Sequence, residues 1–137
     1  MKRLINISNH PSHAWSTEQL KGWDEVIDIE FPRIRTDASV RDIEKEVQRV
    51  IDSIVPKIAG VSPRDEDTYV YVAGEYTFVS MLLLSLLNYV SKLRMAFPVT
   101  QRHPDKNTFV FYGWRTFEIE IDFYPSPEES DFIIKFK

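Results

Sequence analysis

A strand, a glycine turn and a very apolar helix are predicted within residues 68–88, TYVYVAGEYTFVSMLLLSLLN. The run at 69–72 consists of β-branched and aromatic residues, a composition typical of a buried strand. Gly74 permits a tight turn, and the Met- and Leu-rich run from Tyr76 predicts a helix of about four turns. A strand that passes through a tight turn into a helix is the repeating unit of α/β proteins, so this stretch favours that fold class.

The start of this helix is a candidate anion site. The first turn of a helix presents unpaired N–H groups and a partial positive charge, which suit a phosphate. Ligands of open α/β sheets bind at the carboxyl ends of strands, so we expect Gly74, Glu75 and Thr77 to line a ligand site. Glu75 has a second interpretation, because its carboxylate can instead interact with the N-terminus of its own helix.

Two further strand–helix units precede this stretch. Residues 4–8 form a compact apolar strand, and the alternation at 25–31 predicts a strand near a sheet edge. Ser16 begins a short helix with a capping-box pattern. Ser39 can cap a longer amphipathic helix, which Pro56 is expected to kink or end.

The last third of the chain is rich in predicted strands. Residues 93–99 predict a strand that Pro98 ends or confines to a sheet edge. Residues 108–112, 117–123 and 131–136 predict three more, and the alternation at 117–123 is the most regular in the chain.

The order of these elements predicts one α/β domain over residues 1–137. In residues 1–100 strands and helices alternate, which calls for right-handed crossovers and a Rossmann-like parallel sheet flanked by helices. The strands of residues 101–137 are expected to add an antiparallel β extension. The stretches at 61–67 and 125–130 are predicted loops.

Composition argues against several classes of protein. The chain has no cysteine, which excludes a disulfide framework and a thiolate metal site. The N-terminal apolar stretch is too short for a signal peptide, and polar residues interrupt the apolar helix well short of a membrane span. A net charge of −4 argues against binding long nucleic acid through its backbone. We therefore expect a cytoplasmic protein without a membrane partner.

The loops after the first and third strands face each other at a topological switch point if those two strands are neighbours. The first strand and its loop supply a set of polar residues, Ser8, Asn9, His10 and Ser12. His10 is the candidate proton carrier in this set, although a lone histidine in a surface loop often has no chemical role.

A further polar cluster follows the fourth predicted strand and is placed to close the pocket. Arg102 is the best phosphate ligand by chemistry, because its guanidinium fork matches phosphate oxygens. Gln101 adds an amide beside it. Both residues also fit a plain solvated turn.

Metal and cofactor sites have little support in the sequence. His10 and His13 are three residues apart, but no acidic third ligand stands at metal spacing. G-x-S-x-G, Walker A and G-x-G-x-x-G motifs are missing, so hydrolase, P-loop and dinucleotide-binding interpretations are unsupported. We expect neither a metal nor a cofactor.

Several of these residues resemble a known family. Residues 4–12, which contain S-N-H-P-S, and residues 17–20, T-E-Q-L, are similar to the small standalone CARF-type (CRISPR-associated Rossmann fold) proteins of type III CRISPR antiviral systems. The strand, turn and helix at 72–78 also fit, and the resemblance covers about residues 1–100. It implies a CARF-like domain that binds cyclic oligoadenylate as a homodimer, since a symmetric ring is most naturally bound across a two-fold axis.

The resemblance also implies a metal-independent ring nuclease. The ribose 2′-hydroxyl would attack the adjacent phosphorus in line and leave a 2′,3′-cyclic phosphate, with His10 as proton carrier. Amides near Gly74 and Thr77 and the cation of Arg102 would stabilise the developing charge. Two alternatives remain open: a module that senses or sequesters the ring without cleaving it, and a structural interaction domain.

Overall fold

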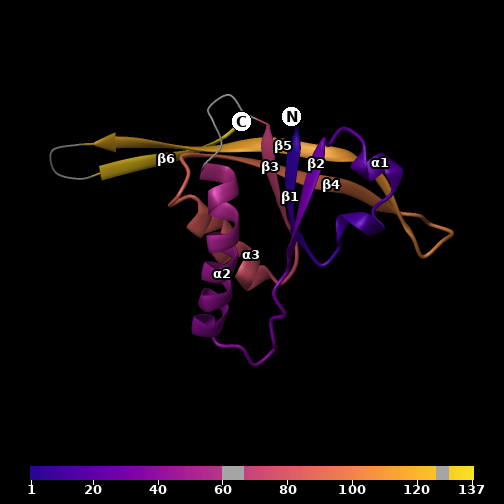
Figure 1. Ribbon diagram of the computed structural model, residues 1–137, viewed down its shortest axis with the longest axis horizontal. Coiled ribbons are helices and arrows are strands. Elements are labelled where there is room, and N and C mark those ends of the chain that lie inside the picture. The colour runs from indigo at the N-terminus through magenta and orange to yellow at the C-terminus, as the bar shows by residue number, and fades with distance from the viewer. Residues whose placement is uncertain (60–66, 126–129) are drawn as a thin grey trace.

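A six-stranded sheet organises the chain, and the computed structural model describes residues 1–59, 67–125 and 130–137. In chain order its elements are β1 (Arg3–Ser8), the 3-10 helix η1 (Ser12–Ala14), α1 (Thr17–Leu20), β2 (Glu25–Glu30), α2 (Val40–Ala59), β3 (Thr68–Val72), α3 (Tyr76–Leu86), β4 (Lys92–Arg102), β5 (Phe109–Pro125) and β6 (Ser130–Phe136). Figure 1 shows α2 and α3 on one side of β1 and β3, with α1 on the other. The loops predicted at 61–67 and 125–130 lie almost wholly outside the described residues.

The sheet is mixed, with the strand order β2-β1-β3-β4-β5-β6. β1 pairs in parallel with both β2 and β3, and β3 pairs in parallel with β4 at Val70 and Met95. β4, β5 and β6 are antiparallel. The prediction of an α/β fold is confirmed, and β2 lies at a sheet edge as predicted, but the sheet as a whole combines both kinds of pairing.

The main core lies between the sheet and the helices α2 and α3. One face of β1 and β3 contributes Ile5, Ile7, Val70 and Val72, all buried. The apolar stripe of α2 meets them because its apolar residues recur at helical spacing: Ile43, Val47, Val50, Ile51 and Ile54. This packing fixes the end of the sheet from which the loops of the candidate site emerge.

Pro56 does not end α2, and α3 is shorter than the sequence predicts. α2 continues past Pro56 to Ala59, because a proline removes a single backbone donor and the core contacts of Ile51 and Ile54 hold the preceding turns. α3 ends at Leu86, two residues before Asn88, and its 11 residues make about three turns instead of the four predicted. None of the described helices is both long and apolar enough to cross a membrane.

β4 also differs from its prediction, since Pro98 neither ends it nor lies on an edge strand. The strand runs on to Arg102, and Pro98 pairs with Trp114 of β5. β3 ends at Val72, and with Val70 level with Met95 this places Pro98 just beyond the end of β3. Pro98 therefore interrupts no ladder toward β3. Beyond it, the predicted strands at 108–112 and 117–123 form the single strand β5.

The opposite face of the sheet carries an aromatic cluster. Trp15, Tyr71 and Trp114 lie against one another, with ring centroids 5.6 to 6.5 Å apart. α1 is capped by Ser16, whose hydroxyl accepts from the Gln19 N–H at 3.2 Å, as the capping-box pattern predicts. Trp114 Nε1 donates to the Gln19 carbonyl at 3.0 Å and so ties α1 to β5.

Candidate functional site

The loops that follow β1 and β3 lie side by side at the carboxyl ends of these strands. The condition that the sequence sets is met, because β1 and β3 are neighbours, and the Ala73 N–H donates to the Ile7 carbonyl at 3.1 Å just past the last register pair. The helices that follow leave in opposite directions, α1 over one face and α3 over the other. This is the switch-point arrangement in which open α/β sheets bind ligands.

The first loop is held by side chains that converge on the backbone of His10. Its carbonyl accepts from Asn6 Nδ2 at 2.9 Å and from Trp15 Nε1 at 2.9 Å. Its N–H donates to the Ser8 hydroxyl at 3.1 Å, and that hydroxyl donates to Asn6 Oδ1 at 2.7 Å. Asn6 is only 1% exposed, so the loop is fixed from inside the protein.

Asp28 on the neighbouring strand β2 completes this network. Its carboxylate accepts from Asn6 Nδ2 at 2.9 Å. It also accepts from the Ser12 N–H at 3.1 and 3.2 Å and from the Ser12 hydroxyl at 2.7 Å. The hydroxyls of Ser8 and Ser12, predicted to bind ligand, therefore form part of the loop's own structure. Sequence reasoning missed Asn6 and Asp28, whose signal is a polar residue in mid-strand.

Asn9 and His10 expose their side chains at the tip of this fixed loop. The hydrogen bonds described for His10 are made by its backbone N–H and carbonyl. Its imidazole lies at the surface of a loop whose backbone is already ordered. The loop can thus present an amide and an imidazole to a ligand at little cost in ordering entropy.

Gly74 is required by packing as well as by the turn. A Cβ at this position would lie 2.3 Å from Cζ of Phe31, and the backbone has a φ of 155°, which L side chains rarely adopt. The Phe31 ring also meets the Phe78 ring edge-on, with centroids 5.0 Å apart. The segment after β2 therefore crosses to the end of β3 and covers the core side of the turn.

The carboxylate of Glu75 occupies the start of α3. It accepts from the Thr77 N–H at 3.0 Å and from the Phe78 N–H at 2.7 Å. These hydrogen bonds, that from Phe78 foremost, hold the pKa of Glu75 below its ordinary value. The amides predicted to receive a ligand phosphate are thus already bonded to Glu75, in line with the second interpretation of that residue.

Gln101 and Arg102 lie on the β4–β5 hairpin, away from Gly74. Arg102 pairs with Phe109 across the hairpin, and its guanidinium donates to Asn107 Oδ1. In Figure 1 the tip of this hairpin projects past α1, at the far right of the view, whereas β3 ends near the centre. The structure does not bring these two residues to the turn after β3, because β4 runs on alongside β5 beyond the end of β3.

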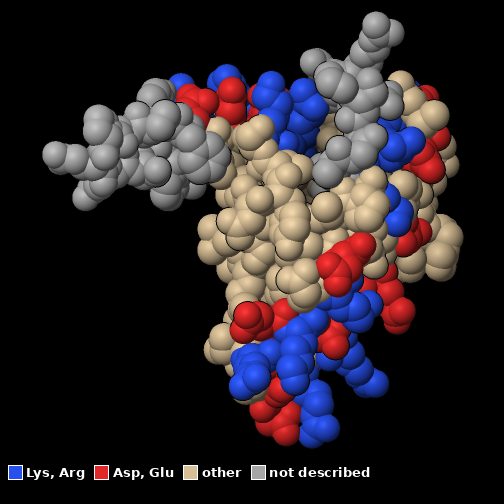
Figure 2. All heavy atoms as spheres, turned by 60° about the vertical axis from the view of Figure 1, so that its left-hand side comes forward, with Lys and Arg blue, Asp and Glu red and all other residues tan. Residues whose placement is uncertain are grey.

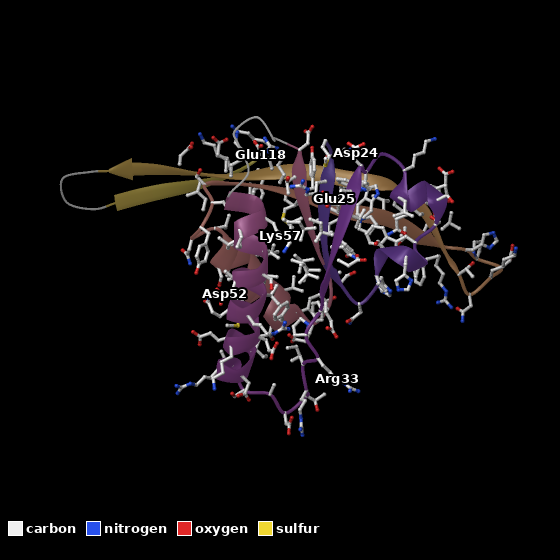
Figure 3. The ribbon with its side chains drawn as sticks, viewed as in Figure 1. Asp24, Glu25, Arg33, Asp52, Lys57 and Glu118 are labelled. Carbon is white, nitrogen blue, oxygen red and sulfur yellow. The ribbon has the colours of Figure 1, made fainter. Side chains whose placement is uncertain are left out.

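Sequence reasoning missed Arg33, a cation on the segment that follows β2. It is exposed and lies two residues after Phe31, whose ring reaches Gly74. Figure 3 shows its side chain directed away from α2 and α3. A hollow of about 380 Å³ opens beside it, lined by Arg33, Ile34, Arg35, Asp37, Ala38, Asp42, Ile43 and Glu46. The signal in the sequence is the alternating P-R-I-R that follows β2.

The part of the chain that the structure describes contains no candidate metal centre. Within residues 1–59, 67–125 and 130–137, no three His, Asp or Glu side chains gather closely enough to hold a metal ion. The loops after β1 and β3 can supply hydrogen-bond donors and the exposed imidazole of His10, and the segment after β2 adds the guanidinium of Arg33.

Comparison with known proteins gave no match. The chain matches no protein-family model, no curated protein and no solved structure.

Proposed function

We propose that this chain binds a cyclic oligoadenylate at the carboxyl ends of β1 and β3, with the four parallel strands acting as a Rossmann-like core. The observation that carries the proposal is the first loop, which Asn6 and Asp28 fix from inside while Asn9 and His10 remain exposed. A fixed polar loop at a switch point is suited to binding, since few degrees of freedom are lost when the ligand arrives.

The ligand class comes from the resemblance, whose S-N-H-P-S motif is the same loop. Residues 8–12 form the end of β1, the exposed tip and the start of η1. The motif therefore coincides with the polar loop at the switch point that Asn6, Ser8 and Trp15 hold by hydrogen bonds. On this proposal the chain acts in the cytoplasm in type III CRISPR defence.

Recognition of the ligand phosphates falls to exposed donors rather than to the α3 amides. Glu75 occupies those amides, and a phosphate would have to displace its carboxylate. Arg33 offers an exposed guanidinium two residues from Phe31, and guanidinium geometry suits phosphate oxygens. Asn9 can add an amide donor from the first loop.

Cleavage of the ring is a separate part of the proposal and depends on His10. The 2′-oxygen forms a bond to the adjacent phosphorus while the bond from phosphorus to the 5′-oxygen breaks. The proton of the 2′-hydroxyl passes to a base, and the 5′-oxygen takes up a proton as it leaves. His10, exposed at the tip of the first loop, is the residue that we propose carries this proton, and no step needs a metal.

A homodimer is proposed because a ring with rotational symmetry suits a two-fold axis and α3 exposes apolar side chains. The sequence of α3, YTFVSMLLLSL, contains no charged residue, and Leu84 is 66% exposed. On the face seen in Figure 2, charged residues gather at the lower end and also lie along the top and the right-hand side, while the middle is largely uncharged. A second copy of this chain is the proposed occupant of that surface.

Titration with cyclic tri-, tetra- and hexa-adenylate, followed by analysis of the products, tests the proposal. We expect one ring to bind and to be converted, in the presence of EDTA, to a linear product with a 2′,3′-cyclic phosphate. Replacing His10 by alanine should slow cleavage about a hundredfold while binding persists, whereas His13→Ala, three residues away, serves as the matched control.

The other outcomes separate the alternatives. A ring that binds and is recovered intact would make the chain a sensor and remove the role of His10. Failure of all three rings to bind would overturn the proposed function and leave the structural interaction domain.

A further inference from the structure

The β4–β5 hairpin carries a row of aromatic rings that leads outward from the first loop. Trp15, which holds the loop carbonyl of His10, lies 5.6 Å from Trp114 between ring centroids, and Trp114 lies 5.8 Å from Phe111. Two residues further out, Phe109 is on the same face and is 73% exposed. The row thus begins at the candidate site and ends at an exposed ring.

A β-bulge puts these rings on one face. Val99 pairs with Gly113 and Thr100 with Phe111, so Tyr112 is an extra residue on β5. Strict alternation would place Phe111 and Trp114 on opposite faces, and the extra residue brings them to the same one. The bulge therefore aligns the outer half of the hairpin with the aromatic cluster around Trp15.

The end of the row combines an aromatic ring with a fixed guanidinium. Arg102 is the cross-strand partner of Phe109, and Asn107 holds its side chain in place. The hairpin is locally basic, with Arg102, Lys106 and Arg115 against Asp105, in a chain of net charge −4. A polyanion that carries flat bases complements both features, since bases stack on aromatic rings and on guanidinium planes.

We propose that Phe109 and Arg102 form a stacking platform for an adenine base of the ligand. This inference rests on the proposed function and names the part of the ligand that the hairpin recognises. Phe109 is about 13 Å along the strand from Trp114, so a ligand of several nucleotides can contact the first loop and the platform together. The separation of Arg102 from Gly74 is then expected, because Arg102 meets one adenine base of the ring and not a phosphate beside Gly74.

The test uses the full chain and the ring that the parent binds among cyclic tri-, tetra- and hexa-adenylate. Phe109→Leu keeps an apolar side chain but removes the aromatic face, and should weaken binding about five- to a hundredfold. Phe109→Tyr keeps the face and should bind like the parent. The matched control is Tyr112→Leu, the same kind of change at the bulge residue, which is 66% exposed and should leave affinity unchanged.

A second measurement reports stacking directly. In Phe109→Trp the new indole should lose fluorescence as the ring is added, whereas Tyr112→Trp should show no such loss. Arg102→Lys keeps the charge but lacks the planar guanidinium, and should weaken binding even at low salt.

Three results would overturn the inference. If Phe109→Leu binds as the parent does, the platform is wrong while the proposed function stands. If Phe109→Leu changes the oligomeric state in light scattering but not the affinity, the exposed ring belongs to an interface between copies. If the parent binds none of the rings, the proposed function fails and this inference fails with it.

Discussion

Gly74 illustrates how a residue at a candidate site can be required for the fold. The sequence predicts that Gly74 permits a tight turn and lines a ligand site, and the structure places the Phe31 ring where a Cβ of residue 74 would lie. A substitution there therefore acts first on the packing of Phe31 and Phe78. Loss of binding in a Gly74 variant is informative only when stability is measured beside it.

We expect Gly74→Ala to lower the free energy of unfolding by about 1–3 kcal/mol, because the new methyl group overlaps the Phe31 ring. Urea unfolding followed by circular dichroism measures this. Combining it with Phe31→Leu, which shortens the side chain, should cost less than the sum of the two single changes. Additive costs would show that the clash with Phe31 is not the cause.

Glu75 gives a pH dependence with a definite direction. Its folded-state pKa is lowered from 4.5 by the N–H groups of Phe78 and Thr77, so the carboxylate stabilises the fold above that pH. The advantage of the parent over Glu75→Gln in unfolding free energy should be complete at neutral pH. It should shrink as the pH falls below 4.5 through the folded-state pKa. A difference in unfolding free energy that stays constant from pH 7 to pH 3 would show that the hydrogen bonds of the Glu75 carboxylate to the start of α3 do not stabilise the fold.

At the scale of elements, the first loop depends on a strand that follows it in the chain. Asp28 of β2 accepts hydrogen bonds from Asn6 and Ser12. Without it the buried Asn6 amide loses one of its two acceptors and keeps only the His10 carbonyl. The order of the loop is therefore a property of the β1–β2 pair.

Replacing Asp28 by alanine should speed amide hydrogen exchange at His10 and Ser12 and weaken binding of the ring. The unfolding free energy should fall by about 1–3 kcal/mol, the usual cost of a buried donor left unpaired. Glu30→Ala, two residues along the same face of β2, is the matched control and should leave exchange in the loop unchanged. Equal exchange in both variants would separate Asp28 from the order of the loop.

Elements with regular patterns could be predicted from the sequence, but the register and the length of their pairing could not. The β-branched run of β3 and the apolar stripe of α2 are local signals, and both elements occur as predicted. Pro98 wrongly predicts the end or the edge position of its strand, because β4 can accept a proline at this point only where β3 has already ended. The position of Arg102 depends on how far β4 runs alongside β5, and the hydrogen bonds of Asp28 depend on the register of β2. No single stretch of sequence encodes these pairings.

At the scale of the whole molecule, the uncharged helix α3 bears on whether the protein is a monomer or a dimer. Buried residues Phe78, Leu82 and Leu86 of this helix complete the core of one chain. Leu84 lies on the outer side and contributes nothing to that core. The exposed side chain of Leu84 is therefore free to contact a second copy of the chain.

We expect a dimer in light scattering at micromolar concentration and a monomer for Leu84→Glu, because a carboxylate would have to be desolvated in an apolar interface. Val40→Glu is the matched control, since Val40 is likewise 66% exposed but lies at the start of α2. A parent that is monomeric with and without cyclic adenylate would contradict the assembly. Dissociation of both variants would place the interface elsewhere.

The pairing of β1 with β3, a strand that comes much later in the chain, has a consequence for folding kinetics. β4 and β5 follow each other directly and form a local hairpin, whereas β1 must find β2 and also β3, which lies beyond α2. In pulsed hydrogen exchange during refolding, amides of β4 and β5 should be protected before those of β1, and simultaneous protection would contradict this order. The loops at the carboxyl ends of β1 and β3 take their places only when β1, β2 and β3 have paired. The loop that carries Asn9 and His10 is then among the last parts of the molecule to form. A chain caught midway through refolding has the β4–β5 hairpin with Phe109 but not yet this loop.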